Sequence, residues 1–376
     1  MAGIYIHIPF CKQACHYCDF HFSTQVQNKS DFLEALKKEF GLRQDYLLKE
    51  KISTIYFGGG TPSLLHGDEL KSILDWIHQY YEVDSNAEIT LEANPDDLDK
   101  KKVQDFRDSG INRLSIGIQS FRDDDLKWMN RAHSASQADY AVKASQDSGF
   151  ENITIDLMYS IPNLDMKSWK ENLNEAISLD IQHVSAYSMT IEPRTVFGVR
   201  QAKGLLHPVD DTLSQDQFLV MIEELKLAGI VQYEVSNFSK PGFESKHNSA
   251  YWKGEKYIGL GPSAHSFDGS SRQWNVANNH VYINEIANGR LKHEKEILDD
   301  RTMYNEYIMT RLRTTWGIEL PYISHRFGID IVKSNEDYLS SMKKDGKLLM
   351  DKNKIVLTSE GLLFADRIAS ELFIVE

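Results

Sequence analysis

Short apolar runs alternate with amphipathic stretches through the first 240 residues of the chain. The apolar runs are rich in β-branched residues and have strand length, whereas the stretches between them place apolar residues at helical spacing, as in Phe32, Leu36 and Phe40. The predicted strands are residues 4–8, 52–57, 88–93, 113–118, 153–158, 182–188 and 231–236. Strands that alternate with helices predict a parallel α/β sheet, either doubly wound or curved into a barrel.

Glycines mark the ends of several predicted helices. Gly110, Gly149 and Gly229 each stand directly before a predicted strand, where glycine provides the left-handed conformation that stops a helix. The alternation ends near residue 240, and from about residue 301 the chain is predicted to form several short helices. A final strand then leads into a helix capped by Thr358 or Ser359. We therefore expect a core domain at 1–240, a connecting segment at 241–300, and a smaller, mostly helical, winged-helix-like domain at 301–376.

Composition and charge narrow the functional classes. The 376 residues are 41% hydrophobic and 26% charged, as in ordinary globular proteins. Acidic residues outnumber basic ones by 55 to 42, and the net charge of −13 argues against nonspecific nucleic-acid binding. No apolar run approaches the ~18 residues of a membrane span, so we expect no direct membrane insertion. The N-terminus lacks a basic region of the secretory type, which predicts a cytoplasmic protein.

The three cysteines of the chain lie close together. Cys11, Cys15 and Cys18 have the spacing C-x3-C-x2-C, and an odd, tightly packed set of this kind indicates metal binding rather than disulfides. Three thiolates leave either a tetrahedral zinc or a [4Fe-4S] cluster one ligand short. One interpretation is a structural zinc site completed by a histidine, with His7, His16 or His21 as candidates. The other is a cluster with one iron open to an exogenous ligand.

Chemically distinctive residues follow the predicted strands. The first strand leads into the cysteine loop, and the next ones end at Gly58-Gly59-Gly60-Thr61, Glu92-Ala-Asn94, Gln119-Ser120 and Asp156. Taken singly, each has a simple structural explanation as a tight turn, a helix cap or a solvated side chain. The glycine run also lacks the spacing of a Walker or Rossmann loop. Ligands nevertheless bind at the C-terminal ends of parallel strands, so together these residues predict one binding site.

The motifs resemble those of the radical S-adenosylmethionine (SAM) superfamily. The sequence Tyr5-Ile-His7-Ile-Pro9-Phe10-Cys11, with the glycine run and Glu92-Ala-Asn94-Pro95, is similar to the group that contains oxygen-independent coproporphyrinogen III oxidases and haem chaperones of the HemW type. The resemblance covers nearly the whole chain. It implies an incomplete (β/α)6 TIM-like barrel, a [4Fe-4S] cluster held by Cys11, Cys15 and Cys18, and SAM chelated to the open iron. It further implies SAM contacts from these residues: Tyr5, Tyr17, Gly59, Gly60, Thr61, Glu92, Gln119, Arg131 and Asp156.

Within this group the chain most resembles the haem chaperones. The oxidases carry a fourth cysteine two residues after the third, where this chain has Phe20, and their cysteines follow a long N-terminal extension. The run His247-Asn248-x-x-Tyr251-Trp252 is similar to a motif of HemW-type proteins. The resemblance implies that the chain binds haem and delivers it to haem-requiring apoproteins such as respiratory enzymes.

Several side chains in and after that motif have the chemistry needed to bind haem. His247, Tyr251 and also His265 can ligate haem iron, and Trp252 can pack on the porphyrin. A purely structural role is the alternative, with His247 and Asn248 capping a turn and Tyr251 and Trp252 in the core. The alternative function is that of a radical SAM oxidoreductase acting on a porphyrinogen. Whether the chain is an enzyme, and whether it is a monomer or a homodimer, is left open.

Overall fold

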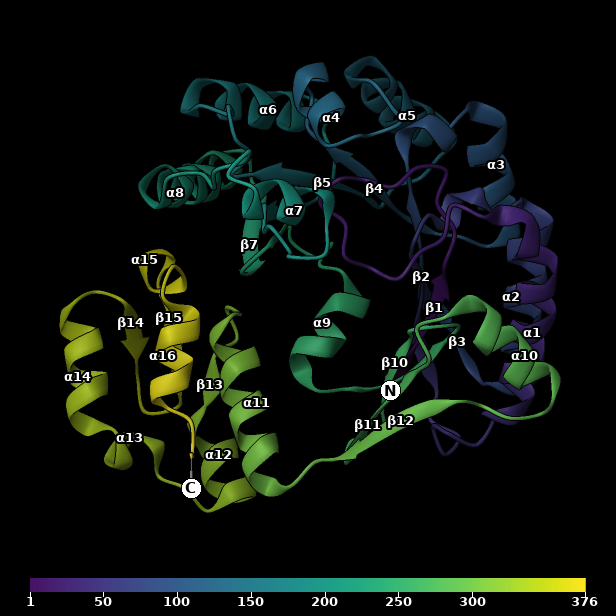
Figure 1. Ribbon diagram of the computed structural model, residues 1–376. Helices are drawn as coiled ribbons and strands as arrows, with labels where there is room; N and C mark the ends of the chain where they lie inside the picture. The colour runs from purple at the N-terminus through teal and green to yellow at the C-terminus, as the bar shows by residue number, and fades with distance from the viewer. Residues whose placement is uncertain (376) are drawn as a thin grey trace.

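The computed structural model describes residues 1–375, and within them the strands form one 12-stranded sheet and a separate three-stranded sheet. The large sheet has the order β12-β11-β10-β9-β1-β2-β3-β4-β5-β6-β8-β7 (Figure 1). Its strands are β1 (Ala2–Ile8), β2 (Ile52–Gly59), β3 (Val83–Ala93), β4 (Arg113–Gln119), β5 (Ile153–Tyr159), β6 (His183–Ser188), β7 (Val231–Glu234), β8 (Asn237–Ser239), β9 (Lys256–Leu260), β10 (His265–Phe267), β11 (Ser271–Asn275) and β12 (His293–Ile297).

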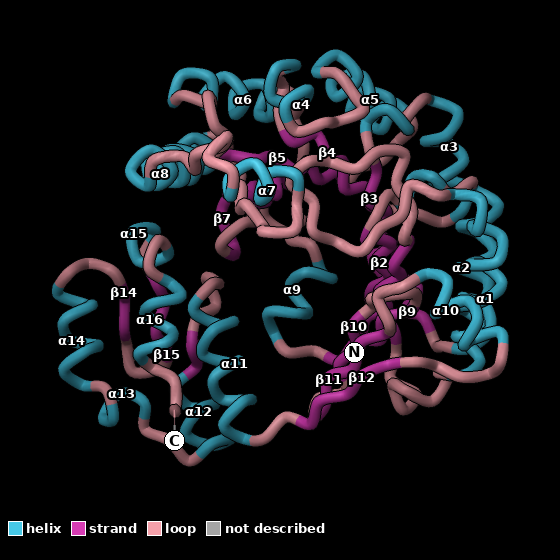
Figure 2. The backbone as a smooth tube through the Cα atoms, viewed as in Figure 1, coloured by secondary structure: helices cyan, strands magenta, loops and turns pink. Residues whose placement is uncertain are grey.

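The strands from β1 to β6 run parallel and curve into an incomplete barrel, with helices on the outer face (Figure 2). The covering helices are α1 (Lys29–Leu42), α2 (Gly67–Tyr80), α3 (Lys100–Ser109), α4 (Asp123–Trp128), α5 (Ala135–Asp147), α6 (Met166–Ser178) and α8 (Asp211–Leu227). Gly110, Gly149 and Gly229 all have positive φ at or just after helix ends, as predicted. The incomplete barrel expected from the sequence is therefore confirmed.

The edge at β7 differs from the prediction. We expected residues 231–236 to continue the parallel pattern, but β7 ends at Glu234 and pairs antiparallel with β8, which in turn pairs antiparallel with β6. Only two residues separate β7 from β8, and so short a connection allows a hairpin but no crossover helix. This hairpin leaves the sheet open at this edge.

The segment at 241–300 is part of the main sheet rather than a simple connector. Helix α9 (Lys246–Lys253) crosses the inner side of the barrel, and β9 then pairs parallel with β1. Strands β10, β11 and β12 extend the sheet antiparallel, and α10 (Asn279–Ala287) packs against α1. The first strand of the barrel therefore has neighbours on both sides, one of them about 250 residues away in the chain.

The last part of the chain builds its own hydrophobic core around a small sheet. Its helices are α11 (Asp300–Leu312), α12 (Leu320–Phe327), α13 (Ile331–Ser334), α14 (Glu336–Lys344), α15 (Ser359–Leu362) and α16 (Ala365–Glu371), and its strands are β13 (Ile318–Glu319), β14 (Leu348–Met350) and β15 (Lys354–Leu357). Thr358, rather than Ser359, caps the final strand–helix unit by accepting a hydrogen bond from Gly361. Short helices around a three-stranded sheet match the winged-helix-like expectation.

A buried carboxylate joins the sheet extension to the barrel. Glu39 on α1 has no exposed surface and accepts hydrogen bonds from Tyr282 (2.6 Å), Asn275 (2.7 Å) and the amide of Gly261 (2.8 Å). Arg43, also buried, lies 3.6 Å from the Glu39 carboxylate. Burial raises the pKa of Glu39, and the arginine opposes that shift. A buried charge of this kind is tolerated only where its partners are all present.

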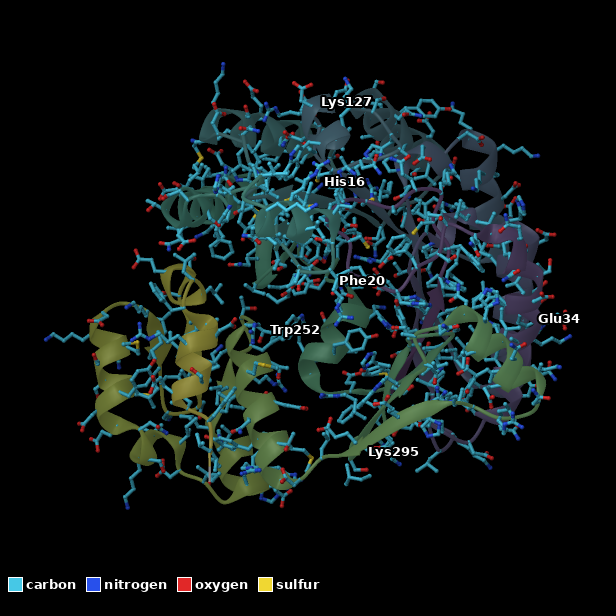
Figure 3. All side chains as sticks on the ribbon, viewed as in Figure 1. His16, Phe20, Glu34, Lys127, Trp252 and Lys295 are labelled. Atoms are coloured by element: carbon cyan, nitrogen blue, oxygen red, sulfur yellow. The ribbon has the colours of Figure 1, made fainter. Side chains whose placement is uncertain are left out.

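Glu39→Ala is expected to lower the free energy of unfolding by about 3–5 kcal/mol, because Arg43 and three donors would lose their partner inside the protein. Glu34→Ala is the matched control, since Glu34 lies on the same helix but faces solvent (Figure 3), and its effect should stay within about 0.5 kcal/mol. Denaturant unfolding of both variants measures this. Equal, small losses would show that the buried network contributes little.

A pocket lined by the three cysteines

The cysteine loop and the glycine run meet through their backbones. The amide of Gly60 donates to the carbonyl of Ile8 (2.8 Å), and the amide of Thr61 donates to the carbonyl of Phe10 (2.7 Å). A Cβ on Gly60 would lie 2.6 Å from the Phe10 carbonyl oxygen, so only glycine permits this approach. The pairing brings the Thr61 hydroxyl to the sulfur of Cys11, to which it donates a hydrogen bond of 3.4 Å.

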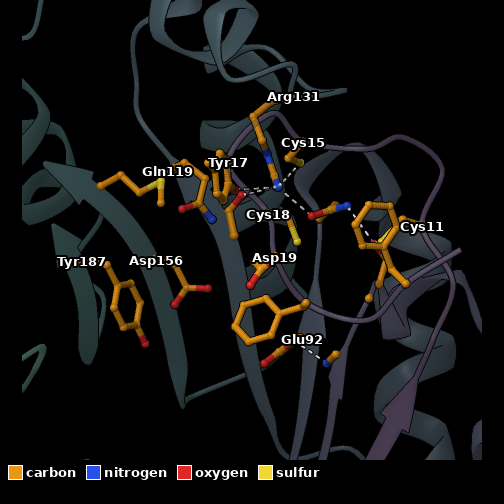
Figure 4. A pocket seen from close by; sticks show the side chains of 18 of the residues that line it. Cys11, Cys15, Tyr17, Cys18, Asp19, Glu92, Gln119, Arg131, Asp156 and Tyr187 are labelled. Atoms are coloured by element: carbon orange, nitrogen blue, oxygen red, sulfur yellow. Dashed lines mark hydrogen bonds between the residues drawn. The ribbon is translucent and has the colours of Figure 1, made fainter. Parts of the chain in front are cut away.

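All three cysteines line one cavity of about 650 Å³ at the C-terminal ends of the parallel strands (Figure 4). Nine residues predicted from the sequence also line this cavity: Tyr17, Gly59, Gly60, Thr61, Glu92, Asn94, Gln119, Arg131 and Asp156. The structure thus brings the strand-end residues together as expected. A cavity of this size holds one small ligand.

Arg131 is the main cation of the pocket. Its guanidinium donates to Asn94 and to the carbonyl of Gly117, both at 2.7 Å, and to the sulfur of Cys15 at 3.4 Å. A further bond of 3.4 Å reaches the hydroxyl of Tyr17. Its Nε is buried without a protein partner among the described residues. The guanidinium is therefore held beside the cysteine loop by partners on three segments of the chain.

Glu92 and Asp156 are two of the four carboxyl groups that line the cavity, with Asp19 and Glu192 as the others. Glu92 accepts hydrogen bonds from Tyr56 (2.8 Å) and the amide of Gly59 (3.3 Å), and Asp156 accepts one from Ser115 (3.3 Å). Burial raises the pKa of Glu92 to about 7, with a further contribution from the nearby Asp156. Burial likewise raises the pKa of Asp156 to about 6. The pair can therefore accept hydrogen bonds from the hydroxyl or amino groups of a ligand.

The backbone is left-handed at the ends of β4 and β5, the strands that carry Gln119 and Asp156. Gln119 adopts a φ of +68° and Ser160 a φ of +56° at the ends of β4 and β5. A left-handed conformation costs a side-chain-bearing residue on the order of 1 kcal/mol, and such strain concentrates at functional sites. At Gln119 it coincides with a register shift between β4 and β5, which turns the amide toward the cavity.

Tyr5 does not join the pocket lining, in contrast to the sequence expectation. Its ring stacks on Tyr56, with ring centroids 6.2 Å apart, and its hydroxyl contacts His7 Nδ1 at 3.2 Å. Tyr5 therefore lies behind the cavity and packs the residue that holds Glu92. Tyr56 itself, which the sequence analysis overlooked, is signalled only by its place two residues before the glycine run.

The predicted haem ligand His247 is also a core residue. Its Nδ1 is 2.8 Å from the hydroxyl of Thr54, and its Nε2 is 2.9 Å from the hydroxyl of Tyr251. Burial lowers the pKa of His247 to about 3. With both ring nitrogens used inside the protein, the imidazole has no position left for iron. In this structure Thr54 and Tyr251 therefore satisfy His247, and its assignment as a haem ligand stays a prediction.

The rest of that motif also lies outside the cysteine pocket. Asn248 and Trp252 are half-buried on α9, and neither lines the cavity. Ser245, rather than His247 or Asn248, caps this helix by accepting a hydrogen bond from the Asn248 amide. In Figure 3, Trp252 and Phe20 both lie in the middle of the molecule, between the barrel and α11.

The histidines proposed for a zinc site are engaged elsewhere. Nε2 of His7 contacts the carbonyl of His21 (2.8 Å), Nδ1 of His16 contacts the carbonyl of Trp128 (3.0 Å), and Nε2 of His21 contacts Asn279 (2.7 Å). Each of these rings therefore has a nitrogen bound to a partner other than a cysteine. The three thiols therefore fit a cluster with an open site better than a Cys3His zinc ion.

Comparison with known proteins agrees with this geometry. The family model of the radical SAM superfamily matches residues 5–176, and that of the HemN C-terminal domain matches residues 298–364. The solved structure of coproporphyrinogen III oxidase (HemN) from Escherichia coli, described as a radical SAM enzyme, superposes with a TM-score of 0.85 at 21% identity, covering 100% of this chain and 90% of that one. The chain is thus a radical SAM protein of the HemN-like group.

Relatives described as heme chaperones identify the family within this group. Heme chaperone HemW of Bacillus subtilis (strain 168) is 34% identical, over 98% of both chains. Heme chaperone HemW of Mycobacterium tuberculosis (strain ATCC 25618 / H37Rv) is 32% identical, over 98% of this chain and 94% of its own. The chain belongs to the HemW family. Radical SAM membership implies a [4Fe-4S] cluster and SAM as cofactors.

The raised carboxyl pKa values predict a pH-dependent stability. Glu92 binds its proton more tightly in the folded chain than in the unfolded one, so stability falls as pH rises from about 4.5 to about 7. Glu92→Gln should remove this loss, because the amide side chain does not titrate. At pH 8 the variant should therefore be more stable than the wild type by about 2 kcal/mol. This value follows from about 1.4 kcal/mol per unit of pKa shift, reduced for screening by water in the pocket. Thermal unfolding at pH 5 and pH 8 tests this, and a variant less stable at both values would contradict it.

Proposed function

We propose that this protein binds haem and delivers it to haem-requiring apoproteins, such as respiratory enzymes, with a SAM-binding [4Fe-4S] cluster as its resident cofactor. One observation carries the proposal. A chain that matches heme chaperone HemW over 98% of its length places three cysteines, a close-approach glycine loop, an arginine and two carboxyls around one cavity. The proposed cellular site is the cytoplasm. Within residues 1–375, no helix is long and apolar enough to cross a membrane.

The cysteines of the cavity are the proposed cluster ligands. Cys11, Cys15 and Cys18 are all half-buried free thiols, and thiolates are the ligands that iron–sulfur clusters use. Such a cluster supplies electrons and an open iron for SAM. Thr61 and Arg131 hold the sulfurs of Cys11 and Cys15 in position by hydrogen bonds. These donors also stabilise negative charge on the sulfurs.

The remaining cavity residues are proposed to hold SAM. Gly59 and Gly60 line the cavity with their backbone, and the guanidinium of Arg131 is proposed to pair with the SAM carboxylate. Glu92 and Asp156 accept from the amino group or the ribose hydroxyls. Tyr17 and Gln119 complete the walls. The function proposed for the cavity is to orient SAM against the cluster.

Phe20 supports the chaperone proposal over porphyrinogen oxidation. It stands where the oxidases have a fourth cysteine, its side chain is 73% exposed, and it lines the cavity mouth. A phenylalanine supplies neither a metal ligand nor a proton donor at that position. We propose that the chain is organised as a core at 1–240, a segment at 241–300 that extends the sheet of this core, and a C-terminal domain at 301–376. The separate hydrophobic core that begins at Tyr304 supports the last boundary.

Anaerobic reconstitution with iron and sulfide is the first test of this function. We expect about four irons per chain, saturable uptake of one haem, transfer of that haem to an apoprotein, and no decarboxylation of coproporphyrinogen. The triple variant Cys11→Ala/Cys15→Ala/Cys18→Ala should lose the iron. Gln13→Ala, in the same loop, should keep it, because Gln13 donates to the Asn130 carbonyl instead. Repeated turnover of coproporphyrinogen would replace the chaperone function with that of an oxidase.

Thr61 is expected to influence the potential of the reconstituted cluster. Hydrogen bonds to cysteine sulfurs raise the reduction potential of iron–sulfur clusters, and Thr61 donates one to Cys11. Thr61→Val keeps the shape but removes the donor, so the potential should fall, whereas Thr61→Ser should stay close to the wild type. Potentiometric titration followed by electron paramagnetic resonance gives both values. Identical potentials for the valine and serine variants would argue against this role.

A further inference from the structure

The turn that follows β3 contacts two side chains that donate hydrogen bonds to cysteine sulfurs. Thr61 donates to Cys11 at 3.4 Å, and Arg131 donates to Cys15, also at 3.4 Å (Figure 4). The side-chain amide of Asn94 lies between these two donors. Its Oδ1 accepts a hydrogen bond of 2.7 Å from Arg131, and its Nδ2 donates one of 3.3 Å to the hydroxyl of Thr61. The five side chains therefore form one continuous hydrogen-bonded chain from Cys11 to Cys15.

The chemistry of Arg131 determines the direction of each hydrogen bond in this chain. A guanidinium only donates, so the atom of Asn94 that faces it must be the carbonyl oxygen. The amide nitrogen of Asn94 is then directed to Thr61, whose oxygen accepts. The single hydroxyl proton of Thr61 is thereby left for the sulfur of Cys11. A side chain that touches neither sulfur thus directs the hydrogen bond that one of them receives.

The backbone of Asn94 is held in place by contacts outside this chain. Asn94 precedes Pro95, which favours an extended conformation, and its φ of −89° and ψ of 143° lie in that region. Its backbone amide donates to the hydroxyl of Ser63 (3.2 Å), and that hydroxyl donates to Asp97 (2.7 Å). Lys12 of the cysteine loop also pairs with Asp97. A substitution of the Asn94 side chain therefore leaves the contacts between the turn and the loop in place.

We propose that Asn94 is a positioning residue for the cluster, which directs Thr61 and Arg131 to the cysteine sulfurs and thereby raises the reduction potential of the cluster. This role rests on the proposed [4Fe-4S] cofactor and adds a residue that acts on its ligands without touching them. Hydrogen bonds to the sulfurs tune the potential of such clusters, and groups that orient metal ligands tune the metal. The Asn94 side chain is uncharged, so its effect on the potential is exerted through these bonds.

A double-mutant cycle in the reconstituted full chain tests this role. Asn94→Leu keeps a branched side chain of similar length but removes both contacts of the amide, so the potential should fall although Thr61 is still present. In the double variant Asn94→Leu/Thr61→Val, the fall should be clearly smaller than the sum of the two single falls, because both substitutions weaken the same hydrogen bond to Cys11. Potentiometric titration followed by electron paramagnetic resonance gives all four potentials.

A second measurement detects the hydrogen bond itself. Electron–nuclear double resonance of the reduced cluster in deuterated buffer reports exchangeable deuterons close to the sulfurs. The signal that is lost in Thr61→Val should also weaken in Asn94→Leu, because the Thr61 hydroxyl is no longer directed to Cys11. Gln13→Leu is the matched control for both measurements, since it removes an amide that also lines the cavity but donates to the Asn130 carbonyl. Iron content and circular dichroism report cluster assembly and folding independently.

The outcomes separate the role of Asn94 from the proposed cofactor. Unchanged potential and deuteron signal in an iron-loaded Asn94→Leu, or additive falls in the double variant, would overturn the role and leave the cluster intact. An equal fall in Gln13→Leu would overturn it too, because the effect would then be general to the lining. If Asn94→Leu loses its iron, Asn94→Ala takes its place, and loss of iron from both would overturn a role in tuning. A wild-type chain that assembles no [4Fe-4S] cluster would overturn the cofactor itself.

Discussion

The close approach of two backbones, at the ends of β1 and β2, is the constraint on which the candidate site depends. Gly60 and Thr61 donate to carbonyls of the segment that leads into the cysteine loop, and no side chain fits at Gly60. This contact sets the position of Cys11 relative to the Thr61 hydroxyl. It also fixes the position of Gly59 along β2, and the amide of Gly59 donates a hydrogen bond to the carboxylate of Glu92 on β3. A loop that carries three cysteines is thereby joined to the rigid sheet before any metal binds.

Much of the barrel and of the pocket follows from local sequence, because strand length, helical spacing and glycine stops are local properties. The strand-end residues Glu92, Gln119 and Asp156 could be placed together since parallel strands bring their C-terminal ends to one edge. Tyr5 and His247 could not be placed in this way. Their roles depend on Tyr56, Thr54 and Tyr251, and the Thr54–His247 contact joins residues 193 positions apart. A motif identifies such a residue without revealing which neighbours satisfy its polar atoms.

The sheet extension shows a second reason why sequence patterns fall short. Strands β10 and β11 are short, and β11 carries polar residues such as Ser271, Gln273 and Asn275 toward the interior. Alternation of apolar and polar residues therefore does not reveal them. Their inward polar groups are acceptable because Glu39 and Arg43 on α1 provide partners, and a buried polar group needs such a partner. The hydrophobic pattern of these strands can be understood only together with a helix more than 200 residues earlier.

These buried polar contacts separate two chemically different surfaces on one inner sheet face. Below the cavity, Tyr5, Tyr56 and His247 form a stacked layer whose polar atoms are directed to Glu92, Thr54 and Tyr251. The polar atoms of this layer are used inside the protein, and Tyr56 supports the carboxylate of Glu92. Beyond β1, the same face carries Tyr257, Phe267 and Trp274, together with Arg272, which pairs with Glu306. The two parts of the face therefore differ in chemistry, since hydrogen bonds dominate the first and aromatic rings around an ion pair dominate the second.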